Sequence, residues 1–159
     1  MSKDEPMQVT SNVPSYQHTQ RGPLCLLFYV LGTTFLLKIW ISPDKPTIWS
    51  VFLGLLMIVT AACFHHLTVK DLGDRLSISF GPIPLFHRTV KYADIVKVEV
   101  DRTWLLDGWG VHVSVRGGWL WNLWGRDCIR LQLKKGVLRI GTDDAATLAA
   151  FLEGKPGVH

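Results

Sequence analysis

Tryptophan is concentrated in one stretch, and arginine accompanies it. Five of the seven tryptophans lie between positions 104 and 124. An indole ring is large and apolar yet carries one N–H donor, and arginine adds a charged planar fork. This composition is typical of protein hot spots and of contacts with anionic headgroups. We therefore predict a binding surface formed by Trp104, Trp119, Trp121, Trp124, Arg102, Arg116 and Arg126.

The same rings have an alternative place, in the core. Trp119, Trp121 and Leu123 alternate as they would on one face of a strand, and Trp109 would then plug the domain. Large aromatic side chains are mostly buried, although five are hard to bury together in one small domain. The sequence leaves both interpretations open.

Histidine and cysteine suggest a metal site at only one place. His65 and His66 follow Cys63 closely, but adjacent residues of a helix do not face each other and no acidic residue lies near. The three cysteines form no Cys-x-x-Cys pair. We predict neither a bound metal nor a cofactor.

Catalytic patterns are equally weak. No Gly-x-Ser-x-Gly nucleophile motif occurs, and Gly108-Trp109-Gly110 lacks the third glycine of a dinucleotide loop. The neighbouring carboxylates Asp143 and Asp144 are explained by the N-terminus of a helix, where negative charge is favourable. We therefore predict that the protein is not an enzyme.

Two apolar runs dominate the first half of the chain. Residues 24–42 carry one charge, Lys38, and residues 48–64 carry none, with a proline-containing link between them. About 17–25 apolar residues in a helix cross a bilayer, whereas a soluble helix normally keeps a polar stripe. We predict a transmembrane hairpin over 24–64, with spans 24–42 and 48–64. A helical hairpin buried in a soluble core is the alternative.

Further expectations follow from the hairpin. Gly32 and Gly54 lie in small-residue patches that would let the two helices approach closely. Two spans place both termini on one side, and Arg21, Lys70 and Arg75 favour the cytoplasm. The expected location is the inner, cytoplasmic membrane, with the lipid bilayer as one partner.

Charge restricts the other partners. Lysine and arginine total 17 against 13 acidic residues, a net charge of +4. No run exceeds two basic residues, so no nucleic acid is expected. Residues 1–23 are polar and contain prolines, which predicts a disordered tail, and residues 155–159 form a short tail at the other end.

The second half of the chain, residues 65–154, has the alternating pattern of strands. Its clearest example is Val96, Val98 and Val100, which alternate with Lys97, Glu99 and Asp101. Seven strands separated by turns predict an antiparallel meander closing toward a barrel. Thr142 is the expected N-cap of a final helix whose Leu148, Phe151 and Leu152 share one apolar face.

Five stretches within residues 66–152 carry a resemblance to a known family. They are Leu76-Ser-Ile-Ser-Phe-Gly-Pro82, Val90-Lys-Tyr-Ala-Asp-Ile95, Gly108-Trp-Gly-Val111, Gly118-Trp-Leu-Trp-Asn122 and Ile140-Gly-Thr-Asp-Asp144. With these stretches, residues 66–152 resemble the bacterial pleckstrin-homology-like (PH-like) domains of short membrane proteins that carry an N-terminal transmembrane hairpin. The resemblance implies an α+β membrane protein with a PH-like barrel of about seven strands and a C-terminal capping helix. It also implies binding or scaffolding, not a chemistry.

We therefore expect a membrane-anchored, non-catalytic binding or scaffold module at the cytoplasmic membrane face. The alternative is a subunit or assembly factor of a larger membrane complex. Its partner would be another membrane protein or a second copy of the chain. A small membrane enzyme ranks last, because no nucleophile with a base and no metal site is apparent.

Overall fold

The computed structural model describes residues 15–41, 48–104 and 107–156. Several sequence predictions fall outside these ranges. They concern residues 1–14 of the expected tail, residue 42 at the end of the first predicted span, the link 43–47, and residues 157–159 of the C-terminal tail.

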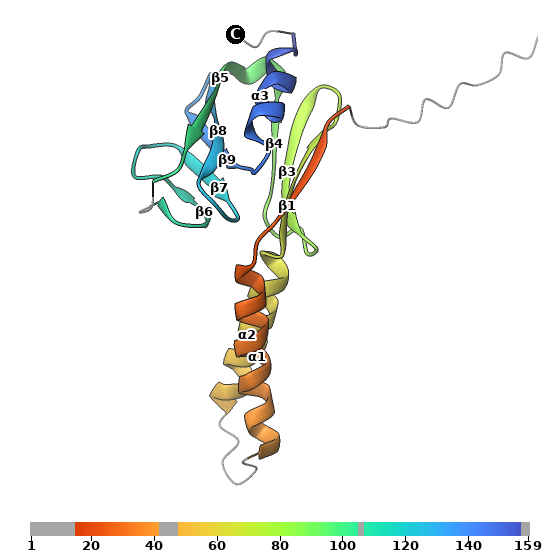
Figure 1. Cartoon of the computed structure of the whole chain (residues 1–159), viewed down its shortest axis with the longest axis vertical. Coiled ribbons are helices and arrows are strands. Elements are labelled where there is room, and N and C mark those ends of the chain that lie inside the picture. Colours follow the sequence, from red (N-terminus) through yellow and green to blue (C-terminus); the bar gives the residue numbers. More distant parts are fainter. Residues whose placement is uncertain (1–14, 42–47, 105–106, 157–159) are drawn as a thin grey trace, which may run out of the picture.

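Two helices, α1 (Leu24–Ile41) and α2 (Ile48–Cys63), form a hairpin that projects away from the rest of the molecule (Figure 1). The helices come closest where Gly32 and Gly54 face each other. A Cβ atom added to Gly32 would lie 2.9 Å from the Gly54 carbonyl oxygen, and one added to Gly54 would lie 3.0 Å from the Gly32 carbonyl oxygen. The predicted close approach at these glycines is confirmed.

The structure contradicts the predicted membrane spans. Among the helices of the described ranges, none is both long enough and apolar enough to cross a membrane. Helix α2 has 16 residues, and such a helix is about 24 Å long against a hydrocarbon core of about 30 Å. Helix α1 has 18 residues and includes Lys38. The prediction of an integral membrane protein with two spans and two cytoplasmic termini is therefore wrong.

The strands form two sheets. The first has the order β1-β2-β3-β4, and the second has the order β5-β8-β9-β7-β6. Their bounds are β1 (Gln17–Arg21), β2 (His66–Asp71), β3 (Arg75–Gly81), β4 (His87–Lys91), β5 (Ile95–Arg102), β6 (Gly110–Val113), β7 (Trp119–Asn122), β8 (Asp127–Leu133) and β9 (Val137–Gly141). A 3-10 turn, η1 (Tyr92–Asp94), connects the two sheets.

The predicted seven-stranded barrel is wrong, although the α+β composition holds. The strands make separate sheets of four and five strands that do not close on each other. Two strand pairings are incompatible with a simple meander. Strand β7 pairs in parallel with β9, and β5 pairs with β8, which follows it only after β6 and β7.

Strand β1 lies in the segment that we expected to be disordered. It pairs antiparallel with β2, from Gln17 opposite Lys70 to Arg21 opposite His66. Just before it, the Tyr16 ring stacks on Phe151 with centroids 5.1 Å apart. Backbone pairing and this stacked ring thus order a polar segment that has no hydrophobic alternation of its own.

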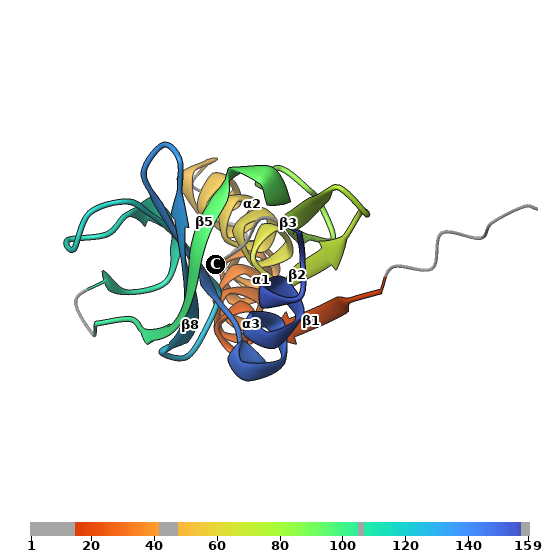
Figure 2. The same ribbon diagram turned by 90° about the horizontal axis from the view of Figure 1, so that it is seen from above.

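Helix α3 (Ala145–Glu153) lies between the two sheets and packs on β5 and β8 (Figure 2). Leu148 and Leu152 are fully buried, as predicted, whereas Phe151 is only partly buried. The N-cap is Asp144, not Thr142 as predicted. The Thr142 hydroxyl instead accepts the backbone N–H of Asp144 at 3.1 Å.

One continuous core joins the two sheets and α3. Leu76, Ile78 and Phe80 of β3 meet Ile129 of β8 and Ile140 of β9 within it, all fully buried. In β5 the expected alternation is not observed, because only Val98 of the three valines is buried, and the register shifts between Ile95 and Lys97. The core therefore fixes the two sheets relative to each other.

Candidate functional site

The end of β5 is joined to the turn that precedes β8. The Thr103 N–H donates to the Arg126 carbonyl at 2.7 Å, and Arg126 Nε donates to the Thr103 carbonyl at 3.3 Å. These reciprocal bonds hold two chain segments side by side. They bring Trp104, which follows β5, close to Trp124, which follows β7.

A buried carboxylate, that of Asp107, holds the backbone at Trp104 and Val115. Asp107 accepts the backbone N–H of Trp104 at 3.0 Å, the Ser114 hydroxyl at 2.7 Å and the backbone N–H of Val115 at 3.2 Å. Burial opposes its ionisation, but these donors and Arg116 together hold the pKa of Asp107 below its usual value. An ionised Asp107 therefore fixes the position of Trp104.

The position of Trp109 is set by the glycines on either side of it and by the side-chain amide of Asn122. Gly108 and Gly110 have φ values of 65° and 109°, a region that side-chain-bearing residues rarely adopt. The buried Asn122 amide donates to the carbonyls of Gly108 at 3.4 Å and Gly125 at 3.2 Å. The Trp109 ring is thereby placed on Trp124, with centroids 4.6 Å apart and an interplanar angle of 20°.

These rings enclose a surface hollow of about 260 Å³, which we call the indole hollow. Trp104 is 56% exposed and Trp109 is 47% exposed, so both rings present open faces. The lining residues are Thr103, Trp104, Gly108, Trp109, Trp124, Gly125 and Arg126.

The indole hollow unites three of the seven predicted site residues, Trp104, Trp124 and Arg126. Trp121 is only 6% exposed, and its ring centroid lies 5.9 Å from that of Phe80 in the core. For this ring the alternative of a place in the core is therefore correct. Trp119 is exposed but does not line the hollow.

Sequence reasoning missed Trp109 as a site residue and gave Asp107 no role. The glycines on both sides of Trp109 were the available signal for its exposure. Nothing local in the sequence distinguishes Asp107 from a solvated carboxylate. Its donors at Trp104, Ser114 and Val115 come together around it only in the folded structure.

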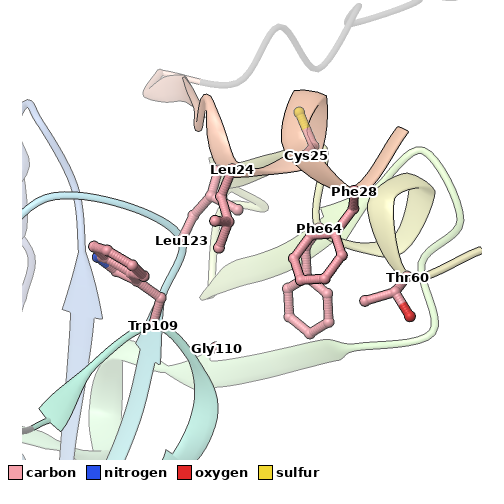
Figure 3. A pocket seen from close by; sticks show the side chains of 8 residues that line it. All are labelled: Leu24, Cys25, Phe28, Thr60, Phe64, Trp109, Gly110 and Leu123. Atoms are coloured by element: carbon pink, nitrogen blue, oxygen red, sulfur yellow. The ribbon is translucent and has the colours of Figure 1, made fainter. Parts of the chain in front are cut away.

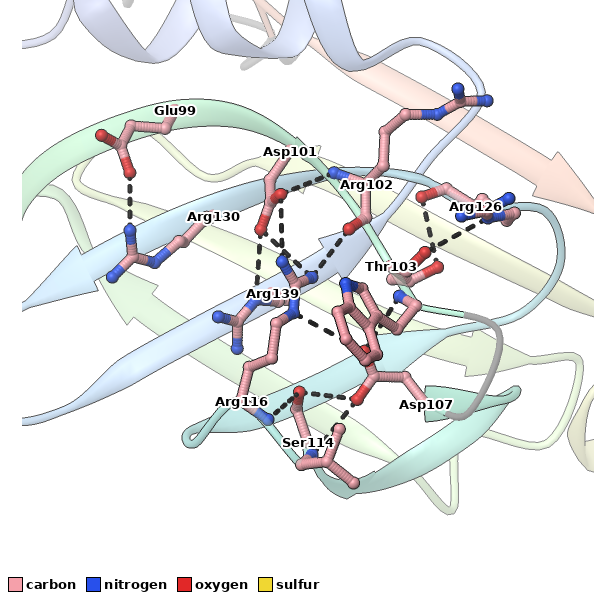
Figure 4. Close-up of polar contacts among 12 residues, drawn as sticks. Glu99, Asp101, Arg102, Thr103, Asp107, Ser114, Arg116, Arg126, Arg130 and Arg139 are labelled. Carbon is pink, nitrogen blue, oxygen red and sulfur yellow. Dashed lines mark hydrogen bonds and ion pairs between the residues drawn. The ribbon is translucent and has the colours of Figure 1, made fainter.

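The remaining predicted residues, Arg102 and Arg116, take part in ion pairs. Arg102 Nε lies 2.9 Å from Asp127 Oδ1. Arg116 lies 3.3 Å from Asp101 and donates to the Arg102 carbonyl at 2.7 Å (Figure 4). Arg116 therefore belongs to a second, polar hollow on the outer side of β5, β8 and β9.

A third cavity, of about 200 Å³, lies where the hairpin meets the second sheet (Figure 3). It is largely apolar, and Trp109 forms part of its wall as well as part of the indole hollow. Its lining residues are Leu24, Cys25, Phe28, Thr60, Phe64, Trp109, Gly110 and Leu123.

Reactive groups are few near these hollows. Burial raises the pKa of the Cys128 thiol to about 12, which keeps it protonated at neutral pH. Within residues 15–41, 48–104 and 107–156, no group of three or more histidine, cysteine, aspartate or glutamate side chains is arranged to hold a metal ion. The groups that line the indole hollow and the polar hollow are mainly indole rings and guanidinium groups.

No protein-family model matches the chain, and no curated protein matches it. The resemblance to PH-like domains thus stays a prediction from the sequence.

Proposed function

We propose that the protein is a non-catalytic binding module, and that its indole hollow receives an apolar side chain of a partner protein together with a neighbouring carboxylate. The observation that carries the proposal is the stacked pair of half-exposed Trp109 and partly buried Trp124, beside the exposed Trp104 and Arg126. Tryptophan and arginine are the residue types most enriched among hot spots.

The geometry of the hollow supports this choice of ligand. Trp109 and Trp124 are held by backbone turns and by each other, so a ligand that packs on them orders few further side chains on binding. Arg126 Nε is bonded to the Thr103 carbonyl, which fixes the guanidinium at the edge of the hollow. A carboxylate of the partner would meet that guanidinium in a bidentate arrangement.

Site-specific photo-crosslinking in the native cell tests the proposal. A photoreactive phenylalanine analogue would replace Trp104 in the full chain, and Trp119 is the matched control because it is 46% exposed and lies outside the hollow. We expect one discrete protein adduct from position 104 and none of that mass from position 119. The same adducts from both positions, or none from position 104, would contradict the proposal.

The hairpin supports a second function, that of a subunit attached to a larger assembly. Both helices expose large apolar side chains to an extent that monomeric proteins rarely show, among them Leu26, Val30, Phe52 and Leu55, each more than half exposed. We propose that apolar helices of a partner protein cover this surface.

A charge placed on the hairpin tests this attachment. Val30→Glu should abolish co-purification of the partner, because a carboxylate buried in an apolar contact is costly. Leu85→Glu is the control, since Leu85 is equally exposed, at 66% against 62% for Val30, but lies between β3 and β4. Retained co-purification by Val30→Glu, or flotation of the purified chain with lipid vesicles in place of a protein complex, would contradict attachment to a protein.

A further inference from the structure

Three arginines from three parts of the second sheet line one hollow on its outer side. Arg116 comes from the β6–β7 turn, Arg130 from β8 and Arg139 from β9, and the hollow measures about 480 Å³. Two carboxylates, Glu99 and Asp101, line it as well. Figure 4 shows Asp101 beside Arg116 and Arg139, with Arg130 bonded to Glu99.

Two of these arginines occupy an unfavourable arrangement. Arg130 and Arg139 are direct cross-strand neighbours of β8 and β9, and like charges directly opposite each other destabilise a sheet. Arg139 is only 4% exposed, so its charge is largely removed from water. An anion held between the two guanidiniums would relieve this repulsion.

The carboxylates present do not saturate the guanidinium donors. Asp101 is shared, because it lies 3.3 Å from both Arg116 and Arg139. Glu99 accepts from Arg130 Nη1 at 2.8 Å and also pairs with Lys97 at 2.7 Å. The Nε atom of Arg130 is buried, and no acceptor lies within hydrogen-bonding distance of it among the described residues. A buried donor left without an acceptor carries a desolvation cost.

We propose that this hollow, the arginine hollow, is a binding site for a phosphate group, either free or carried as a monoester. Guanidinium groups match the oxygens of phosphate. The arginine hollow gathers three of them, although Arg139 is buried and its Nη1 already donates to the Gly117 carbonyl at 2.6 Å. The site lies outside the indole hollow and shares no lining residue with it. The two proposals therefore stand or fall separately.

Calorimetric titration of the full chain with inorganic phosphate tests the site. Arg130→Gln should weaken binding by about tenfold, because it removes the most exposed guanidinium of the three. Glu99→Gln should strengthen binding severalfold, because it frees Arg130 Nη1. Arg75→Gln is the control, since Arg75 pairs with Asp74 on the first sheet and is 41% exposed against 37% for Arg130.

Glycerol 3-phosphate serves as the second ligand and separates the two sources of the phosphate group. Tighter binding than that of inorganic phosphate assigns the site to a monoester, and equal binding assigns it to the free ion. Arg130→Lys retains the charge without the fork, so it should also weaken binding while its thermal midpoint shows that the chain is folded. No binding of either ligand by the wild type, or equal binding by folded Arg130→Lys and the wild type, would overturn the proposal.

Discussion

Trp109 and Trp124 stack with ring centroids 4.6 Å apart and an interplanar angle of 20°, although one precedes β6 and the other follows β7. The stack is the wall of the indole hollow. The tryptophans of this stretch do not share one environment. Trp109 and Trp124 meet at the surface, whereas Trp121 enters the core between the sheets.

Residue-resolved NMR should locate small-molecule binding in the indole hollow. With an aromatic sulfonate added to the full chain, we expect the indole N–H signals of Trp104, Trp109 and Trp124 to shift, because stacking changes their ring-current environment. The signal of Trp119 should stay in place. A shift confined to Trp119, or equal shifts for all exposed tryptophans, would contradict a preformed hollow.

Asp71 should be a stabilising residue with a clear pH dependence. Burial opposes its ionisation, but donors from Ser15, Tyr92 and Lys155 and from the Gly73 N–H hold the pKa of Asp71 below its usual value. Asp71→Ala should lower the free energy of unfolding by about 3 kcal/mol at neutral pH, because it leaves Lys155 without its buried partner.

The sign of that pH dependence follows from the lowered pKa. The contribution of Asp71 is complete above the unfolded-state pKa of about 3.9 and is lost as the pH falls through the lower folded-state pKa. Urea unfolding of the wild type and the variant should therefore converge in acid. Asp74→Ala is the control, since Asp74 pairs with Arg75 at the surface. A difference that grows toward acid would contradict this role.

Helix α3 should be tested through Leu148 and Phe151. Leu148→Ala should cost about 2–5 kcal/mol, because the side chain is fully buried. Phe151→Ala should cost less, but it should also raise hydrogen exchange at residues 17–21, since Tyr16 would lose its stacking partner. Thr147 is exposed on the same helix, so Thr147→Ala serves as the control. An unchanged urea midpoint for Leu148→Ala would show that α3 does not contribute to the core.

The contact between Gly32 and Gly54 should be sensitive to volume. Gly32→Val should separate the helices, because even a Cβ would lie 2.8 Å from Ile58 Cγ1 and 2.9 Å from a backbone oxygen. Overpacking of this kind typically costs about 1–3 kcal/mol, so we expect a lower thermal midpoint. Thr33→Val changes the exposed neighbouring residue and should have little effect. Equal midpoints for the two variants would mean that α1 and α2 do not pack through the glycines.

Local patterns in the sequence predicted the helices and most strands well. The bounds of α1 and α2 follow the apolar runs closely, and α3 follows its periodic leucines. The apolar composition alone does not decide whether these helices cross a membrane. Helix α2 carries no charge, yet it is too short for a membrane span.

Long-range pairing explains what the sequence did not predict. Strand β1 forms because β2 offers it an edge 45 to 53 residues further along the chain, and its own residues give no hydrophobic alternation. Strand β7 is not among the seven predicted strands, because it has only four residues and its parallel partner β9 lies further along the chain. The indole hollow depends on Asp107 and Asn122, whose hydrogen bonds join segments that no local pattern connects.

Co-purification of the full chain with its partner tests the central proposal most directly. The wild type and Trp119→Ala should each retain a protein partner at constant stoichiometry through purification. Trp104→Ala combined with Trp109→Ala should lose that partner while its thermal midpoint stays within a few degrees of the wild type, because both rings are about half exposed. A folded double variant that keeps the partner at wild-type stoichiometry would contradict the assignment of the indole hollow as the binding site.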